Sequence, residues 1–131
     1  MNAQLNIDHI KDEYQAFCHG DFDAMGRLLA DEVVWHVGGH AVASGDKQGR
    51  DEVIDFLRSV AAGTEQNFRI QVHDVLANSE HVVVLCHVTS TRHELTYRAD
   101  EVHLFHVDDE GLIHEAWGFT AEPGGQGAFW F

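Results

Sequence analysis

Apolar and polar residues alternate along the second half of the sequence, and this period of two is the feature that most limits the fold. The alternation predicts strands at Phe68–Leu76, His81–Arg92, Leu95–Val107 and from Leu112 to about Ala121. Short polar connections, such as the acidic turn Asp108–Gly111, favour hairpins between them. Strands joined in this way form an antiparallel sheet, and its apolar face must be covered by another layer.

The first half of the sequence supplies that layer as helices. Asp21 is a natural N-cap for a short second helix, and a third helix is predicted from near Gly49 to Gly63. Helices that precede a meander of long strands indicate an α+β domain, with the helices packed on one face of a curved sheet. The apolar residues at helical spacing that predict the first helix are Ile7, Ile10, Tyr14 and Phe17.

The segment between the second and third helices has two parts. Val33–Val37 is rich in β-branched and aromatic residues and predicts a strand, in which Val33, Trp35 and Val37 share a face. The glycine-rich, polar segment Gly38–Gly49 predicts a loop.

Length and composition indicate a single globular domain over residues 1–131. An apolar fraction of 44% is typical of a folded protein, and the net charge of -14 argues against a nucleic-acid or anionic-membrane partner. The sequence contains neither a signal peptide nor an apolar stretch long enough to cross a bilayer, so we expect a cytoplasmic protein. Cys18 and Cys86 lie within apolar patterns, and we expect both to be buried and reduced.

The strand Leu95–Val107 decides where polar chemistry could occur. Its odd-numbered row is the more apolar at both ends, which places Glu101 and His103 on the face toward the helices, beside Phe105. Their Cα atoms are then roughly 6.5–7 Å apart by the strand rise, so direct or water-bridged contact is possible. In an apolar pocket this pair could exchange protons, because burial raises a carboxylate pKa and lowers an imidazole pKa.

The last strand combines small and large residues. If Ala116 and Gly118 face the helices, they leave a hollow beneath them, and Trp117 and Phe119 then face outward. Exposed large aromatics need a covering partner, so we expect a homodimer through the sheet.

Several segments together resemble the nuclear transport factor 2-like superfamily, and within it the SnoaL-like polyketide-cyclase branch. They are "GDFDAM", "LLADEVVWHVGG", "GRDEVIDFL" and "VHLFHVDDEGLIHEAW", and the similarity extends from about Ile7 to Trp117. The resemblance implies a cone-shaped sheet, wrapped on its concave side by three helices, with a pocket at the open end and dimerisation through the sheet. It also implies that His103 is a polar pocket residue and Trp35 a pocket wall.

The resemblance leaves the identity of the acid–base groups open. Tyr14 lies near the position of a phenol in isomerase-like members, and Glu13 is an equally close match. The base of the isomerases is an aspartate where this sequence has Val37. The base of the cyclases is an aspartate in the last strand, where this sequence has Ala116–Gly118. Glu101 is therefore the candidate base, with His103 as proton donor or orienting partner and Tyr14 as the stabiliser of an oxyanion.

Two classes of function remain. The first is a cofactor-independent acid–base enzyme that isomerises or cyclises a small hydrophobic carbonyl compound, and the second is a binding or adaptor module without catalysis. We expect no metal site, because no ligand spacing typical of one occurs, His103 and His106 point to opposite faces, and only His36 and His40 could meet. The predicted pocket-lining residues are Trp35, Val37, Phe17, Phe56, Cys86, Phe105, Ala116 and Gly118.

Overall fold

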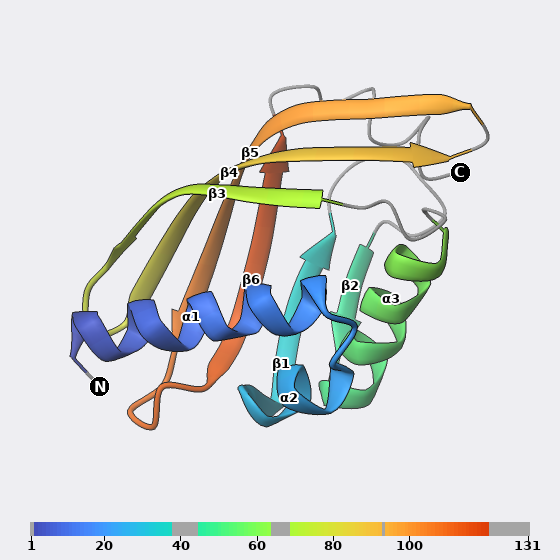
Figure 1. The fold of residues 1–131 in the computed structure, drawn as a ribbon. Helices are drawn as coiled ribbons and strands as arrows, with labels where there is room; N and C mark the ends of the chain where they lie inside the picture. Colours follow the sequence, from blue (N-terminus) through green and yellow to red (C-terminus); the bar gives the residue numbers. More distant parts are fainter. Residues whose placement is uncertain (1, 38–44, 64–68, 93, 121–131) are drawn as a thin grey trace.

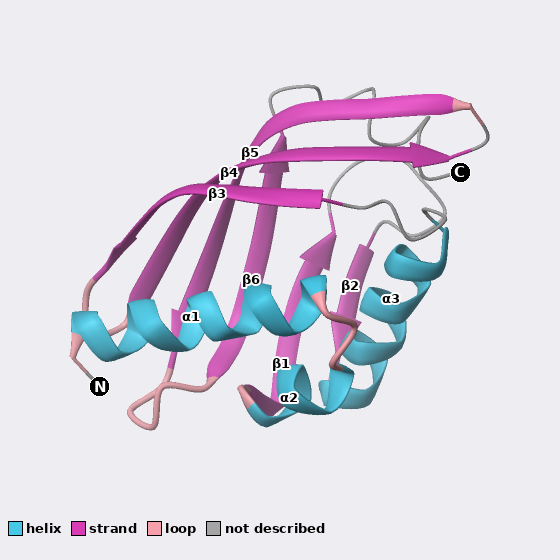
Figure 2. Ribbon diagram, in the orientation of Figure 1, coloured by secondary structure: helices cyan, strands magenta, loops and turns pink. Residues whose placement is uncertain are grey.

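The computed structural model describes residues 2–37, 45–63, 69–92 and 94–120 (Figure 1). Figure 2 shows helices on one side of a strongly curved sheet, which confirms the predicted α+β class. The C-terminal segment "GGQGAFWF" and residues 38–44 of the predicted loop lie outside the described residues. The elements are α1 (Ala3–Cys18), α2 (Phe22–Arg27), β1 (Leu29–Val37), β2 (Gly45–Gln48), α3 (Arg50–Gly63), β3 (Arg69–Ala77), β4 (His81–Arg92), β5 (Leu95–Val107) and β6 (Ile113–Thr120).

The six strands form one sheet in the order β2-β1-β6-β5-β4-β3. The predicted antiparallel pattern holds along β3, β4, β5 and β6, but β1 pairs with β6 in parallel, with Trp35 opposite Ala116. A hairpin cannot make this pair, since β1 is the first and β6 the last strand among the described residues. The sheet is therefore mixed rather than wholly antiparallel.

The prediction of a loop over Gly38–Gly49 was wrong in its second half. Gly45–Gln48 forms the edge strand β2, which pairs with β1 from Val37 opposite Gly45 to Val34 opposite Gln48. The segment "GDKQ" carries no apolar alternation, because an edge strand of this length is mostly exposed. Its strand conformation comes from pairing with β1 and leaves no hydropathy signal in the sequence.

Two helix caps fix the helical layer. The Asn2 side chain accepts a hydrogen bond from the Leu5 amide at 2.9 Å, and Asp21, the predicted cap of α2, accepts one from the Ala24 amide at 3.0 Å. Helix α1 packs on β3 and β4, and α3 packs on β1 and β2. Figure 1 shows both helices on the same side of the sheet.

The buried line of α1 differs from the predicted stripe. Ile10 is buried as expected, but the other buried positions are Asn6, Glu13 and Ala16, whereas Tyr14 is only partly buried. The helix is thus rotated so that two polar residues face inward. The Asn6 side chain donates a hydrogen bond to the Asn78 carbonyl at 2.9 Å, which anchors α1 to the β3–β4 turn.

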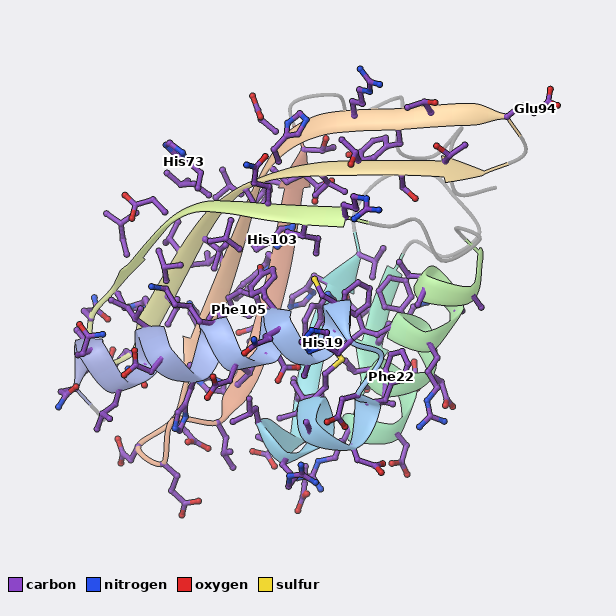
Figure 3. All side chains as sticks on the ribbon, in the orientation of Figure 1. His19, Phe22, His73, Glu94, His103 and Phe105 are labelled. Atoms are coloured by element: carbon purple, nitrogen blue, oxygen red, sulfur yellow. The ribbon has the colours of Figure 1, made fainter. Side chains whose placement is uncertain are left out.

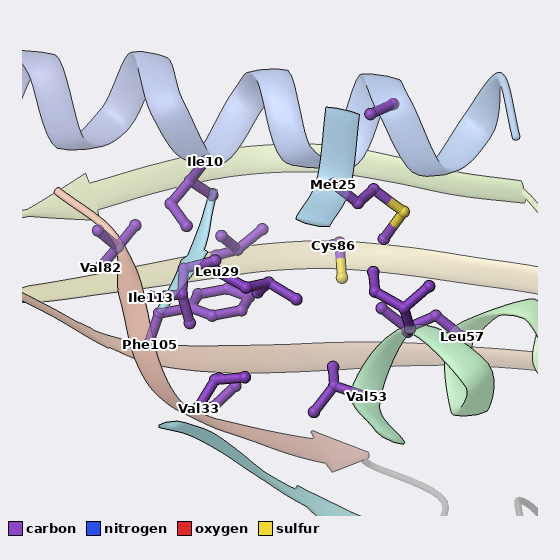
Figure 4. Close-up of a cluster of buried hydrophobic side chains, with 14 of the residues drawn as sticks. Ile10, Met25, Leu29, Val33, Val53, Leu57, Val82, Cys86, Phe105 and Ile113 are labelled. Atoms are coloured by element: carbon purple, nitrogen blue, oxygen red, sulfur yellow. The ribbon is translucent and has the colours of Figure 1, made fainter. Parts of the chain in front are cut away.

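The hydrophobic core lies between the helices and the concave face of the sheet (Figure 4). The row of β4 from Val82 to Val88, which includes the free thiol Cys86, is buried. Cys18, at the end of α1, is also a free thiol but is exposed, so its predicted burial was wrong. On β5 the odd-numbered row faces inward, with Phe105 only 2% exposed, so the predicted orientation of this strand is confirmed. This orientation positions the candidate site.

Candidate functional site

Strand β5 presents Glu101, His103 and Phe105 on its helix-facing side. Figure 3 shows His103 and Phe105 between the sheet and α1, whereas His73 projects from the opposite side of β3. Glu101 is 9% exposed, and the His103 side chain keeps an exposed fraction of 17%. The imidazole is therefore mostly buried but keeps some exposure to solvent.

Four side chains form a continuous hydrogen-bonded system, which we call the site network: Tyr14, His103, Glu101 and Tyr97. The Tyr14 hydroxyl meets His103 Nδ1, and His103 Nε2 lies 2.8 Å from Glu101 Oε1. Tyr97 donates its hydroxyl hydrogen to Glu101 Oε2 at 2.6 Å and lies 2.9 Å from Thr120 Oγ1. The network thus links α1 to β5 and β6.

Sequence reasoning identified three of these residues and missed Tyr97. The structure brings Tyr14, His103 and Glu101 into hydrogen-bond contact, and their roles in binding or catalysis stay predictions. Tyr97 stands in the same inward row as Glu101, four residues earlier, so the alternation on β5 could have revealed it.

Burial and hydrogen bonding set the protonation of the network. Burial alone would lower the pKa of His103, but the Cys86 sulfur and the Glu101 carboxylate outweigh burial and raise this pKa to about 9. Burial, with the nearby Cys86 and Glu101, raises the pKa of Tyr14 well above its ordinary value. At neutral pH the network therefore contains an imidazolium–carboxylate pair and a neutral Tyr14 phenol.

Aromatic side chains and one glycine shape the space around the imidazole. The Tyr14 ring stacks on His103 with centroids 5.8 Å apart, and Phe105 packs edge-on against Tyr14 and Trp35. Gly118 lies directly opposite His103 in the β5–β6 pairing, and a Cβ built there would lie 3.7 Å from His103 Cδ2. The missing side chain keeps that edge of the ring uncovered.

The other predicted lining residues are Cys86, Ala116, Phe17, Phe56 and Val37. Cys86 is buried, with its sulfur 3.9 Å from both ring nitrogens of His103, so it forms a wall behind the ring. Ala116 is fully buried and lies opposite Trp35 in the β1–β6 pairing. Phe17 and Phe56 pack against the hydrophobic core, and Val37 is partly buried at the end of β1. As ligand contacts, all the predicted lining residues stay predictions.

The outer face of the sheet carries a separate cluster. His36 Nε2 lies 2.8 Å from Glu115 Oε2, and this hydrogen bond is the main cause that raises the pKa of His36. The Trp117 ring lies between His36 and His106, with centroids 4.9 and 4.8 Å away. His106 thus faces the opposite side of the sheet from His103, as predicted. The imidazole rings of His36 and His106 partly cover Trp117.

A shallow depression lies farther along β3, β4, β5 and β6, where Phe119 is 54% exposed. Most of its lining residues, including His73, His87 and Val102, belong to the outward rows, and Glu101 of the site network also contributes to the lining. Among the described residues no group of three or more potential ligands could hold a metal ion, and His40 lies outside them. No helix within the described ranges is long and apolar enough to span a bilayer.

Three solved structures share this fold. Bal32a, from a soil-derived mobile gene cassette, superimposes with a TM-score of 0.93 at 20% identity, over 98% of each chain. An NTF2-like protein from Burkholderia xenovorans has a TM-score of 0.80 at 18% identity, over 97% of this chain and 98% of its own. RV0760c from Mycobacterium tuberculosis, solved in complex with estradiol-17β-hemisuccinate, has a TM-score of 0.74 at 18% identity, over 86% of this chain and 91% of its own.

The family assignment follows from the sequence match as well as from the fold. The family model of the SnoaL-like domain matches residues 10–116, from Ile10 on α1 to Ala116 on β6. This range contains all four residues of the site network. The chain therefore belongs to the SnoaL-like domain family and has the NTF2-like fold.

Proposed function

We propose that this protein binds a small hydrophobic carbonyl compound between its helices and its sheet, and that it catalyses cofactor-independent acid–base chemistry on it. An isomerisation or an aldol-type cyclisation fits the groups present. The observation that carries the proposal is the site network, in which the Tyr14 phenol is backed by His103 and Glu101. Such groups, positioned before the substrate arrives, stabilise a developing oxyanion.

The proton arrangement in the network favours Tyr14 as the group that meets the substrate oxygen. With a pKa of about 9, His103 carries both ring hydrogens at neutral pH, and Nε2–H donates to Glu101. Nδ1–H then donates to the Tyr14 oxygen, so the phenol hydrogen of Tyr14 is free to donate to a ligand. His103 supplies the positive charge behind this donor.

Glu101 is better suited to orienting His103 than to abstracting a proton. Oε1 accepts from His103 and Oε2 accepts from Tyr97, so each carboxylate oxygen already has a donor. We therefore assign the orienting role to Glu101 rather than to His103, and Glu101 is not the base. In this role the carboxylate fixes the imidazole and stabilises its charge.

The surroundings support an apolar ligand. Phe105, Tyr14 and Trp35 form an aromatic wall, and Gly118 leaves room beside His103. The steroid ester bound to RV0760c is a largely apolar molecule with carbonyl groups, and that protein shares this fold. Binding without catalysis remains the second candidate, and the engagement of both Glu101 oxygens favours it.

Binding and proton exchange separate these two functions. We expect 2-naphthol, whose apolar rings and single oxygen imitate an enol, to quench tryptophan fluorescence, and Tyr14→Phe to weaken its binding about tenfold. We also expect the protein to catalyse exchange of the α-hydrogens of 1-indanone for deuterium, followed by NMR. Asp12→Asn, which changes an exposed carboxylate on the same helix, is the matched control. Tyr14-dependent binding without exchange would assign a binding module, and binding that ignores Tyr14 would refute both.

A further inference from the structure

Glu13 is a buried carboxyl group without a hydrogen-bond partner. The residue is 3% exposed, and no described residue offers a donor to either carboxyl oxygen. Burial raises its pKa from 4.5 to about 8. Buried polar groups in folded proteins are nearly always hydrogen-bonded, so one left unpaired requires an explanation.

The unpaired carboxyl costs stability without serving the fold. Its neighbours along the buried line of α1, Ile10 and Ala16, show that an apolar side chain is accommodated on this face. Groups that weaken the fold and use no structural partner are typical of functional sites.

Glu13 lies next to the site network. It precedes Tyr14 on α1, both side chains face the interior, and the negative charge of Glu13 contributes to the raised pKa of Tyr14. Helix α1 packs on β3, β4 and α2. The buried titratable group among the described residues of these three elements is Cys86. Their exposed titratable residues include Asp23, Arg27, Arg69, His73 and Asp74. Burial is therefore the cause of the raised pKa of Glu13.

The proposed chemistry needs a proton acceptor that the site network lacks. Both Glu101 oxygens are engaged, His103 carries its full set of hydrogens at neutral pH, and Tyr14 stays a phenol. Glu13 is the carboxyl group near Tyr14 whose oxygens are uncommitted. An acceptor that titrates near the working pH is also the most effective general base.

We propose that Glu13 is the catalytic base of the site and that the substrate is a ketone or aldehyde with a hydrogen on the carbon next to its carbonyl. This assignment rests on the proposed function. The Glu13 carboxylate takes the α-hydrogen as a proton, and the C–H electron pair forms the C=C bond of an enolate. The carbonyl π pair moves onto oxygen, which accepts the Tyr14 hydrogen bond. Return of the proton to the same or a conjugated carbon regenerates the carboxylate and gives exchange or isomerisation without a co-reactant.

The test uses 5-nitrobenzisoxazole, which reports on a general base alone. Loss of its C3 hydrogen to a base breaks the N–O bond and yields a coloured cyanophenolate. We expect the full-length protein to accelerate this elimination with saturation, and Glu13→Gln to lower kcat by roughly a hundredfold. The wild-type rate should rise with pH around an apparent pKa of about 8, and this dependence should vanish in Glu13→Gln. Asp12→Asn should keep the wild-type rate and profile.

Unfolding measurements keep the proposal testable if the Gln variant is poorly folded. Glu13→Leu should raise the midpoint of urea unfolding at pH 8 while abolishing the elimination. Lower stability of Glu13→Leu would show that Glu13 has a structural partner and would overturn the assignment. A wild-type rate in Glu13→Gln, or no saturable acceleration by the unmodified protein, would also overturn it. Binding of 2-naphthol reports on Tyr14. If either of these kinetic results is found while 2-naphthol binding still depends on Tyr14, the role of Glu13 is overturned and the proposed ligand site stands.

Discussion

Tyr97 and Glu101 stand four residues apart on the same face of β5, and the Tyr97 hydroxyl donates to Glu101 Oε2 over 2.6 Å. The bond fixes the carboxylate that in turn holds His103, so a residue outside the immediate ligand space controls the position of the imidazole. Its strength is that of a hydrogen bond to a charged acceptor, which exceeds that of a neutral pair.

Tyr97→Phe should destabilise the fold and loosen His103. Removal of this donor from a buried carboxylate costs about 1–3 kcal/mol, measured as the free energy of urea unfolding. The NMR signal of His103 should broaden or shift, since Glu101 loses one of its two anchors. An unchanged unfolding free energy would contradict the bond. Asp12→Asn, which changes an exposed side chain on α1, is the control.

The His103–Glu101 pair should stabilise the protein at low and neutral pH and lose that effect in alkali. The pKa of His103 is about 9 in the folded state against 6.5 in the unfolded state, so the folded state binds the proton more tightly. The stabilisation is complete below pH 6.5, amounts to about 3 kcal/mol, and disappears as the pH rises through 9. NMR titration of the imidazole measures the pKa directly, and a value near 6.5 would refute the pairing.

Glu13 should add a second loss of stability, at lower pH. Its folded pKa of about 8 lies above the unfolded value of 4.5 because burial disfavours the charged form. Ionisation of Glu13 therefore leaves the free energy of unfolding unchanged below pH 4.5 and lowers it progressively as the pH rises from 4.5 to 8. The decline amounts to roughly 5 kcal/mol. In Glu13→Leu the unfolding free energy should be nearly flat from pH 5 to 7, and a slope equal to that of wild type would contradict the assignment.

Gly118→Leu should block the ligand space without unfolding the sheet. A side chain at this position starts 3.7 Å from the His103 ring, in ordinary contact, and its outer atoms extend over the uncovered edge. We expect 2-naphthol to bind at least about tenfold more weakly, with a cooperative unfolding transition retained. Gly118→Ala, which adds only the Cβ, is the control and should bind nearly as wild type does.

The outer face of the sheet should form a homodimer. Phe119 is 54% and Val102 38% exposed, and the two residues lie opposite each other on β6 and β5. Trp117 lies beside them, between His36 and His106. We expect a solution mass of twice the 14.7 kDa chain at micromolar concentration, and a monomer for Phe119→Asp. A wild-type monomer at that concentration would refute the interface.

The sequence predicted the long strands well, because hydropathy alternation is strong where one face is buried. β4 and β5 begin and end at the predicted residues, and the inward row of β5 follows from its apolar ends. β2 was missed because an exposed edge strand shows no alternation of apolar and polar residues. The parallel pairing of β1 with β6 was missed because no local pattern encodes a contact between distant segments.

The sequence predicts site residues where polar side chains interrupt an apolar row of a strand. It does not predict a polar residue that is buried by the packing of a helix. Glu101 and His103 stand out against Phe105 and Val107 on a strand of known orientation. Glu13 does not, because the rotation of α1 that buries it depends on packing against the sheet and on the Asn6 anchor. A helical stripe drawn from apolar residues alone excludes any carboxyl group by construction.

The parallel pair of β1 with β6 has a consequence for biosynthesis. β1, which follows the first two helices, is joined to β3, β4 and β5 only through β6, the last described strand. The Ile113 amide closes this link by donating to the Leu28 carbonyl at 2.9 Å. A nascent chain on the ribosome therefore cannot complete its sheet until β6 has emerged. Contacts between such distant segments slow folding. Premature termination within β6 thus leaves β1 without a central neighbour and exposes two sheet edges to other chains.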